Sequence, residues 1–186
     1  MVTVAKKITL EEFLQLPETN PASEYIQGKI IQKPMPKGRH SRLQSKLCTV
    51  INQVVETEKI AYAFTELRCT FGGISIVPDV AIFQWKNIPF TANGAIPDDF
   101  KLAPNWTIEI ISPAQKANQV IGNILHCLSF GCSLGWLIDP DDDSVLVFSP
   151  GKQPALIQGE NNLPVLEEIE LNLTVNQLFD WLKMRG

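Results

Sequence analysis

Two apolar segments, residues 77–82 and 106–111, each carry one carboxylate: Asp79 in the first and Glu109 in the second. β-Branched and aromatic residues fill both segments, a pattern typical of buried strands. An ionised carboxylate is costly to bury unless a cation, a proton or hydrogen bonds compensate for the lost water. One cation bound between the two strands would stabilise both side chains, so the pair favours a metal site. For either residue alone, the alternative is a turn cap or a salt bridge with an arginine.

The size and composition of the chain are those of one globular domain. Its 186 residues are 45% hydrophobic and 19% charged, which suits a sizeable core, so we expect a single domain over residues 1–186. No apolar run reaches the ~20 residues that a membrane-spanning helix needs, and the N-terminal region lacks a signal-peptide core. The sequence therefore predicts a cytoplasmic protein without a membrane partner. The four cysteines, at positions 48, 69, 127 and 132, form no CxxC pair, which favours buried thiols over disulfides or zinc.

Positive charge is concentrated in one stretch of an otherwise acidic chain. The net charge is −4 at pH 7, which argues against a protein that coats nucleic acid. Residues 25–55 nevertheless contain six Lys or Arg residues and no Asp or Glu. These six are Lys29, Lys33, Lys37, Arg39, Arg42 and Lys46. The stretch is a candidate phosphate-facing surface, and the alternative is a solvated helix face and hairpin.

The hydrophobic pattern predicts a mixed sheet flanked by helices. A capping box of Thr9 and Glu12 starts a short helix, and residues 24–33 are expected to form a hairpin that turns near Gly28. Longer helices are expected from His40 onward, over 117–130 and over 174–183. Strands are expected over residues 60–71, 76–84, 106–111, 135–140 and 145–148. The strand, helix and strand of residues 106–140 imply a right-handed parallel crossover. The proline-rich residues 88–104 are expected to form a long loop or lid.

Several of these phrases together resemble a known family. They are residues 8–13, residues 24–30, His40 at a helix start, Pro78-Asp79, residues 109–113, and Gly131 followed by residues 135–140. In this order and spacing, and over nearly the whole chain, they are similar to the Uma-two-type restriction-endonuclease-like family of the PD-(D/E)xK nuclease superfamily. The resemblance implies a restriction-endonuclease-like α/β fold, with a mixed central β-sheet flanked by helices and an N-terminal hairpin. It also implies assembly as a homodimer.

The resemblance further implies a catalytic site. In the superfamily, the Asp of the Pro-Asp motif, the Glu of the next strand and the carbonyl after that Glu bind a divalent cation, and these map to Asp79, Glu109 and Ile110. Oxygen ligands suit one or two Mg²⁺ or Mn²⁺ ions, which activate water and neutralise charge on a phosphodiester. Glu24 is a candidate third catalytic carboxylate. His40 is a candidate for a phosphate contact or proton transfer, with a simple helix-entry hydrogen bond as its alternative. The expected function is therefore a magnesium-dependent endonuclease with DNA as its partner.

One residue of the superfamily motif is absent. The motif has a lysine two residues after its glutamate, and here that position is Ile111. Relatives carry an Asp and a Lys on the following helix instead, at positions that correspond by count to Gln119 and Asn123. An amide can donate a hydrogen bond but cannot supply a positive charge. The remaining candidates for that charge are Lys116 and the basic residues between 37 and 42. The alternative function is a catalytically degenerate module that binds nucleic acid or protein.

Overall fold

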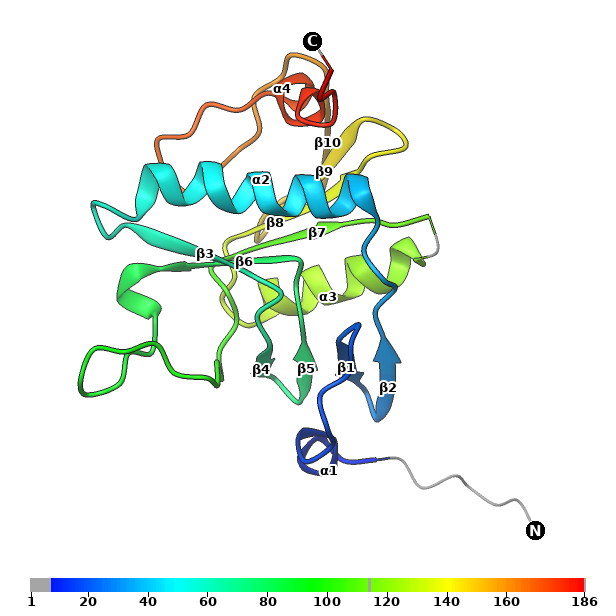
Figure 1. Ribbon diagram of the computed structural model, residues 1–186, viewed down its shortest axis with the longest axis vertical. Helices are drawn as coiled ribbons and strands as arrows, with labels where there is room; N and C mark the ends of the chain where they lie inside the picture. The colour runs from blue at the N-terminus through cyan, green and yellow to red at the C-terminus, as the bar shows by residue number, and fades with distance from the viewer. Residues whose placement is uncertain (1–7, 114, 186) are drawn as a thin grey trace.

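A six-stranded mixed sheet forms the centre of the molecule (Figure 1). The computed structural model describes residues 8–113 and 115–185. The strands lie in the order β10-β9-β8-β7-β6-β3, in which β7 and β8 run parallel and the other neighbours antiparallel. Their bounds are β3 Ala61–Thr65, β6 Val80–Gln84, β7 Trp106–Ile110, β8 Leu134–Asp139, β9 Ser144–Phe148 and β10 Ala155–Gln158. The predicted mixed sheet is confirmed, and β10 is an edge strand that the sequence pattern did not indicate.

Helices cover both faces of this sheet, because successive strand residues point to opposite sides. On one face, α2 (Gly38–Val55) packs its apolar residues against Trp106 and Ile108 of β7, in a core that α4 (Val175–Asp180) also joins. On the other face, α3 (Ala117–Ser129) packs Val120 and Ile124 against Leu137 of β8. Figure 1 shows α2 and α3 on opposite sides of β7 and β8.

A second, four-stranded sheet lies beside α3 and contains the N-terminal hairpin (Figure 1). Its order is β2-β1-β5-β4, with β1 at Ser23–Ile26, β2 at Lys29–Gln32, β4 at Cys69–Phe71 and β5 at Ile74–Ile76. The hairpin predicted over residues 24–33 is confirmed, as is the capping box of Thr9 at the start of α1 (Leu10–Leu14). Because β1 pairs with β5, the hairpin lies next to the segment that leads from β5 into β6.

Two predicted strands are interrupted, and the interruptions create the second sheet. The strand expected over residues 60–71 is divided into β3 and β4, because Glu66 takes a positive φ of 48° and turns the chain out of the central sheet. The strand expected over residues 76–84 is interrupted after Ile76, the last residue of β5, and resumes at Val80 in β6. Pro78 precedes it and has no N–H to donate to a sheet ladder. Asp79 consequently lies at the junction between the two sheets.

The proline-rich residues 88–104 form a loop that is anchored to the second sheet. It follows the short 3₁₀ helix η1 (Trp85–Asn87), and its Phe100 is buried and forms a bridge with Cys69 of β4. All four cysteines are free thiols; Cys69, Cys127 and Cys132 are buried as the sequence predicts, whereas Cys48 is only partly buried. Across residues 8–113 and 115–185, no helix has both the length and the apolar character to cross a membrane.

The predicted parallel crossover is confirmed, and it brings α3 very close to β8 at Gly135. A Cβ at this position would overlap with Cγ2 of Ile124, so the close approach requires a residue without a side chain. We expect Gly135→Ala to lower the free energy of unfolding by about 1–3 kcal/mol through overpacking, as measured by urea denaturation. Gly122→Ala on α3 is the control, because nothing lies within 4 Å of its Cβ. An unchanged Gly135→Ala protein would show that α3 does not pack at this distance.

Candidate active site

Asp79 and Glu109 lie side by side at the end of neighbouring strands. Val80 of β6 pairs with Ile108 of β7, so the antiparallel register places the preceding Asp79 opposite Glu109. The Ile110 N–H donates a hydrogen bond of 2.7 Å to Oδ2 of Asp79. Both carboxylates are buried, with 1% of Asp79 and 3% of Glu109 exposed. The structure therefore brings together the two residues that the sequence singled out as a pair.

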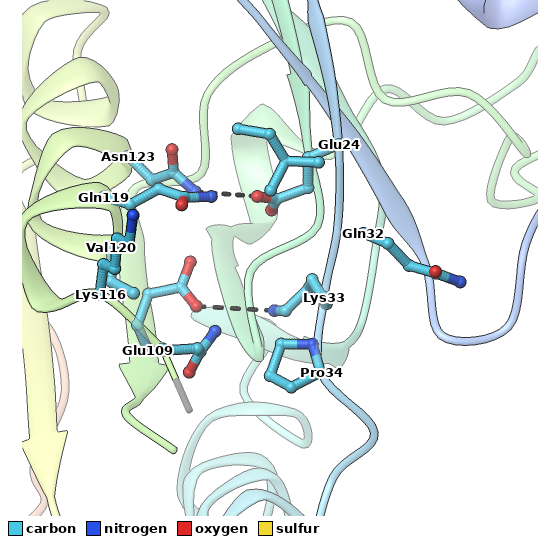
Figure 2. Close-up of a pocket in the computed structure, with 11 residues that line it drawn as sticks. Glu24, Gln32, Lys33, Pro34, Glu109, Lys116, Gln119, Val120 and Asn123 are labelled. Atoms are coloured by element: carbon cyan, nitrogen blue, oxygen red, sulfur yellow. Dashed lines mark hydrogen bonds and ion pairs between the residues drawn. The ribbon is translucent and has the colours of Figure 1, made fainter. Parts of the chain in front are cut away.

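A lysine from the N-terminal hairpin lies between these two carboxylates. Lys33 follows the last residue of β2, and its Nζ donates to Oδ1 of Asp79 at 2.7 Å and to the Val77 carbonyl at 2.6 Å. The same Nζ lies 3.6 Å from Oε2 of Glu109. Figure 2 shows Lys33 and Glu109 facing each other from opposite sides of the cleft. A positive charge thus stands beside the pair, although it comes neither from position 111 nor from residues 37–42.

Glu24 joins the site from β1. Its Oε1 accepts a hydrogen bond of 2.9 Å from the Val77 N–H. Its Oε2 accepts a hydrogen bond of 3.1 Å from Nδ2 of Asn123 (Figure 2). Asn123 lies on α3, at one of the two positions where relatives carry a charged residue. Glu24 therefore links the hairpin, the start of β6 and α3, which are the three elements that surround the pair.

His40, the candidate for a phosphate contact or proton transfer, also reaches the site. It lies in the first turn of α2 and is buried, and its Nε2 is 3.4 Å from Oδ1 of Asp79. Its Nδ1 is buried and has no hydrogen-bond partner within the part of the chain that the structure describes. Its contact is therefore with the candidate metal ligand itself.

The charges of this cluster do not balance, because three buried carboxylates, Glu24, Asp79 and Glu109, surround the single ammonium of Lys33. Burial would raise the pKa of Asp79, but the Lys33 charge and the His40 contact outweigh it and lower that pKa to about 2. Burial raises the pKa of Glu109 well above its usual value; the Lys33 charge lowers this pKa, and the charges of Asp79 and Glu24 raise it further. The pKa of Glu24 is raised as well, chiefly by burial. Burial lowers the pKa of Lys33, but the three carboxylates outweigh it, and the pKa lies above its usual value.

A cleft between the hairpin and α3 gives access to Glu109, Glu24 and Lys33. Its volume is about 270 Å³. Amide and lysine side chains of α3 and of the turn before it form one wall, namely Gln115, Lys116, Gln119 and Asn123. On the other side of Lys33, a smaller cavity of about 70 Å³ is lined by Asp79 and His40. Lys33 lines both spaces, so its side chain lies between the cleft at Glu109 and the smaller cavity at Asp79.

The donor atoms present fit a hard divalent cation. Within residues 8–113 and 115–185, no group of three or more His, Cys, Asp and Glu side chains is arranged to hold a metal ion. The possible ligands are therefore the carboxylate oxygens of Asp79 and Glu109, together with nearby backbone carbonyl oxygens. Oε1 of Glu109 is buried without a hydrogen-bond partner in this part of the chain, and a buried anionic oxygen needs a proton or a cation. Oδ2 of Asp79 accepts one hydrogen bond and keeps a second lone pair.

The basic stretch of residues 25–55 is only partly the solvated surface that its charge indicates. Lys33 has a side chain that is only 11% exposed and lies in the site. Arg39 pairs with Asp141 at 2.8 Å, and Arg42 donates to the Trp181 carbonyl. Several of the charges are therefore engaged within the protein, which weakens the interpretation of the whole stretch as a phosphate-facing surface.

Reasoning from the sequence missed Lys33 as part of the site, although a signal for it exists. In the hairpin register, Ile31 of β2 lies opposite Glu24 of β1. Residues two apart on a strand share a face, so Lys33 lies on the same face as Ile31 and therefore as Glu24. Once Glu24 is considered a site residue, the hairpin pattern alone directs Lys33 toward the same site.

Comparison with known proteins agrees with this architecture. The chain matches the model of the Uma2 family, which is described as "Putative restriction endonuclease", over residues 10–178. It is also similar to a solved structure, the crystal structure of "a putative nuclease belonging to DUF820" from Anabaena variabilis ATCC 29413. The two chains are 54% identical, with 94% of this chain and 99% of that chain covered and a TM-score of 0.93. Among curated proteins, none matches this chain. The restriction-endonuclease-like fold is thereby confirmed, and the chain belongs to the Uma2 family.

Proposed function

We propose that this protein is a divalent-metal-dependent endonuclease that hydrolyses phosphodiester bonds of DNA. Membership of the Uma2 family and the similarity to the Anabaena protein support a nuclease-like function. The observation that carries the finer proposal is the state of Glu109: a buried carboxylate, beside Asp79 and open to a cleft, with one oxygen that has no hydrogen-bond partner among the described residues. Such an oxygen is stabilised when a cation binds, and the cleft admits a substrate to the same place.

Asp79, Glu109 and the Ile110 carbonyl would hold one or two Mg²⁺ or Mn²⁺ ions. The N–H and C=O of a strand residue point toward the same neighbouring strand, and the Ile110 N–H points at Asp79. The bound ion supplies Lewis acidity and lowers the pKa of water. Glu24 positions the start of β6 through the Val77 N–H, and the His40 contact helps to hold the orientation of the Asp79 carboxylate.

The arrangement of the functional unit follows from the substrate. A DNA duplex has two antiparallel strands, and two copies of the chain related by a two-fold axis would present one site to each strand. We therefore propose that the protein acts as a homodimer on DNA, in the cytoplasm. Sedimentation velocity with and without duplex DNA tests the dimer independently of cleavage.

The experiment that tests this function combines metal binding with cleavage. Magnesium and manganese are titrated calorimetrically into the wild type and into Glu109→Gln, and a supercoiled-plasmid nicking assay is run on the same samples. We expect the substitution to weaken metal binding at least ~tenfold, since it removes an anionic ligand, and to slow nicking by about 10²–10³-fold. Glu167→Gln, at an exposed position, is the matched control and should behave as the wild type does.

The same assay separates the two candidate functions. Ile111, at the position of the motif lysine, favours the second candidate, a recognition module that keeps the fold but does not cleave. Metal binding that depends on Glu109 together with nicking would support the nuclease. Wild-type protein that binds DNA but does not nick it in either metal would support the recognition module and refute the nuclease.

A further inference from the structure

We propose that Lys33, supplied by the N-terminal hairpin, is the catalytic lysine of this site and performs the role for which position 111 has no charge. The proposal rests on the nuclease function proposed above. It assigns the positive charge to the residue that follows β2 of the second sheet, whereas Glu109 lies on β7 of the central sheet. The site would then be complete, and the absence of a lysine at position 111 would not make this chain a degenerate enzyme.

The contacts that the Lys33 ammonium makes with the described residues leave one of its donors available. An ammonium has three N–H donors. The Val77 carbonyl and Oδ1 of Asp79 accept two of them, at 2.6 Å and 2.7 Å. Oε2 of Glu109, at 3.6 Å, is too far for a hydrogen bond. The third donor can therefore turn to an oxygen atom that enters the cleft, such as a phosphate oxygen or a water molecule.

The position of Lys33 is held by backbone as well as by side-chain contacts. Its own N–H donates to the Ala22 carbonyl at 2.9 Å, which continues the pairing of the hairpin beyond β2. The Val77 carbonyl that accepts from its Nζ belongs to the segment that Glu24 holds through the Val77 N–H. A donor fixed in this way before substrate arrives loses little energy to reorganisation during the reaction.

The other candidate positions for a charge are used differently or lie further out. Ile111 packs against the apolar cluster of α3, β8 and β9, so its position contributes to packing. Asn123 hydrogen-bonds to Glu24. Lys116 lines the cleft but is exposed at its rim, and among the described residues it has no ion pair with Asp79 or Glu109. Of the basic residues discussed, Lys33 alone contacts Asp79 and also borders the cleft.

The role of the charge follows from the reaction. A water oxygen forms a bond to phosphorus, and the bond from phosphorus to one bridging sugar oxygen breaks. The products are a phosphate monoester and an alcohol: the water oxygen remains on phosphorus, one of its protons is released to solvent, and the leaving sugar oxygen takes a proton from solvent. Negative charge gathers on the phosphoryl oxygens in the transition state, and a fixed ammonium within hydrogen-bond reach stabilises it. Lys33 keeps its proton throughout.

The test compares Lys33→Met with a relocated lysine and a matched control. The proteins are the wild type, Lys33→Met, Lys33→Arg, the double variant Lys33→Met/Asn123→Lys, and Lys152→Met, which changes an exposed lysine outside the basic stretch and the cleft. For each, plasmid nicking, calorimetric magnesium binding and the melting temperature are measured. We expect nicking by Lys33→Met to fall about 10²–10³-fold while magnesium binds as tightly as in the wild type or more tightly. The double variant returns an ammonium from α3 next to Glu24, and it should nick at least ~tenfold faster than Lys33→Met.

Each outcome decides the proposal. Lys152→Met at wild-type rate, a slow Lys33→Met that still binds magnesium, and rescue by the double variant would support it. Nicking by Lys33→Met within about threefold of the wild type would overturn it while leaving the nuclease function in place. Loss of magnesium binding together with nicking in Lys33→Met would also overturn it, since Lys33 would then only shape the metal site. If Lys33→Met does not fold, the folded Lys33→Arg protein, which keeps the positive charge, decides instead: cleavage would support the proposal, and absence of cleavage would overturn it. A wild type that never nicks would overturn both proposals.

Discussion

Replacing Asp79 by alanine should lower the free energy of unfolding by about 3–5 kcal/mol at neutral pH, because a buried ion pair loses one partner. In the wild type, the Asp79 carboxylate accepts from Lys33 at 2.7 Å and from the Ile110 N–H at 2.7 Å, and only 1% of the residue is exposed. Its removal leaves Lys33 buried without its nearest anion and the Ile110 N–H without its acceptor. Urea denaturation at pH 7 measures the loss, and cleavage should disappear with it.

The control for this prediction is Asp141→Ala. Asp141 pairs with Arg39 at the same kind of distance, 2.8 Å, but both side chains are more than half exposed. Surface ion pairs contribute roughly 0–1 kcal/mol, so this variant should be close to the wild type. An Asp79→Ala protein as stable as Asp141→Ala would mean that the Lys33 ammonium finds other partners at no cost, contrary to our expectation.

The pH dependence of the Asp79 effect has a definite direction. The folded-state pKa of Asp79, about 2, lies below the usual value of 3.8 that applies to the unfolded chain. The ionised carboxylate therefore stabilises the protein fully above about pH 4, and this contribution is lost as the pH falls toward 2. The difference in unfolding free energy between the wild type and Asp79→Ala should shrink over this range. Denaturation series at several pH values measure it.

Glu109→Gln should have the opposite effect on stability when no divalent cation is present. Burial raises the folded-state pKa of Glu109 above the usual value of 4.5, so the protonated form is favoured in the folded protein. Its contribution to stability is fully present below about pH 4.5 and is lost as the pH rises through the folded-state pKa. Glutamine resembles the protonated acid and carries no charge to bury. At neutral pH in EDTA, we expect Glu109→Gln to be more stable than the wild type by about 1–4 kcal/mol.

Magnesium should make the wild type more stable than Glu109→Gln, which reverses the order of stability expected in EDTA. A ligand that binds only the folded state stabilises it in proportion to the logarithm of its concentration over its dissociation constant, by about 2.7 kcal/mol at a hundredfold excess. The wild type should therefore melt at a higher temperature in magnesium than in EDTA, and Glu109→Gln should show little change. Thermal melts of both proteins at pH 4, 6 and 8 test the two effects together. A wild type already more stable than Glu109→Gln in EDTA at neutral pH would contradict the prediction.

Local pattern was sufficient for the carboxylate pair and for most of the fold. Alternating and continuous apolar runs identified the strands around Asp79 and Glu109, and the structure pairs those strands directly. Capping residues, glycines and helical spacing located the helices to within a few residues. These features are determined by neighbours in the sequence, which is why they could be predicted without tertiary information.

The division of two predicted strands could not be seen in the same way. Residues 60–71 are continuous in β propensity, and the break after β3 depends on the positive φ of Glu66. That conformation is retained because β4 pairs with β5, and β5 in turn pairs with the hairpin strand β1. The pairing of distant segments therefore overrides the local propensity.

The sequence by itself determined that two buried carboxylates occupy neighbouring strands and require a positive charge. Only the tertiary structure decided which residue provides it. Lys33 is separated from Asp79 by 46 residues, and the contact exists because β1 pairs with β5 and carries the hairpin to the start of β6. The motif spacing indicates only positions close to Glu109 in the sequence, whereas the long side chain of Lys33 reaches the two carboxylates from the hairpin of the second sheet. Which side chain places a positive charge beside the carboxylates is therefore a property of the fold, and the need for such a charge is a property of the sequence.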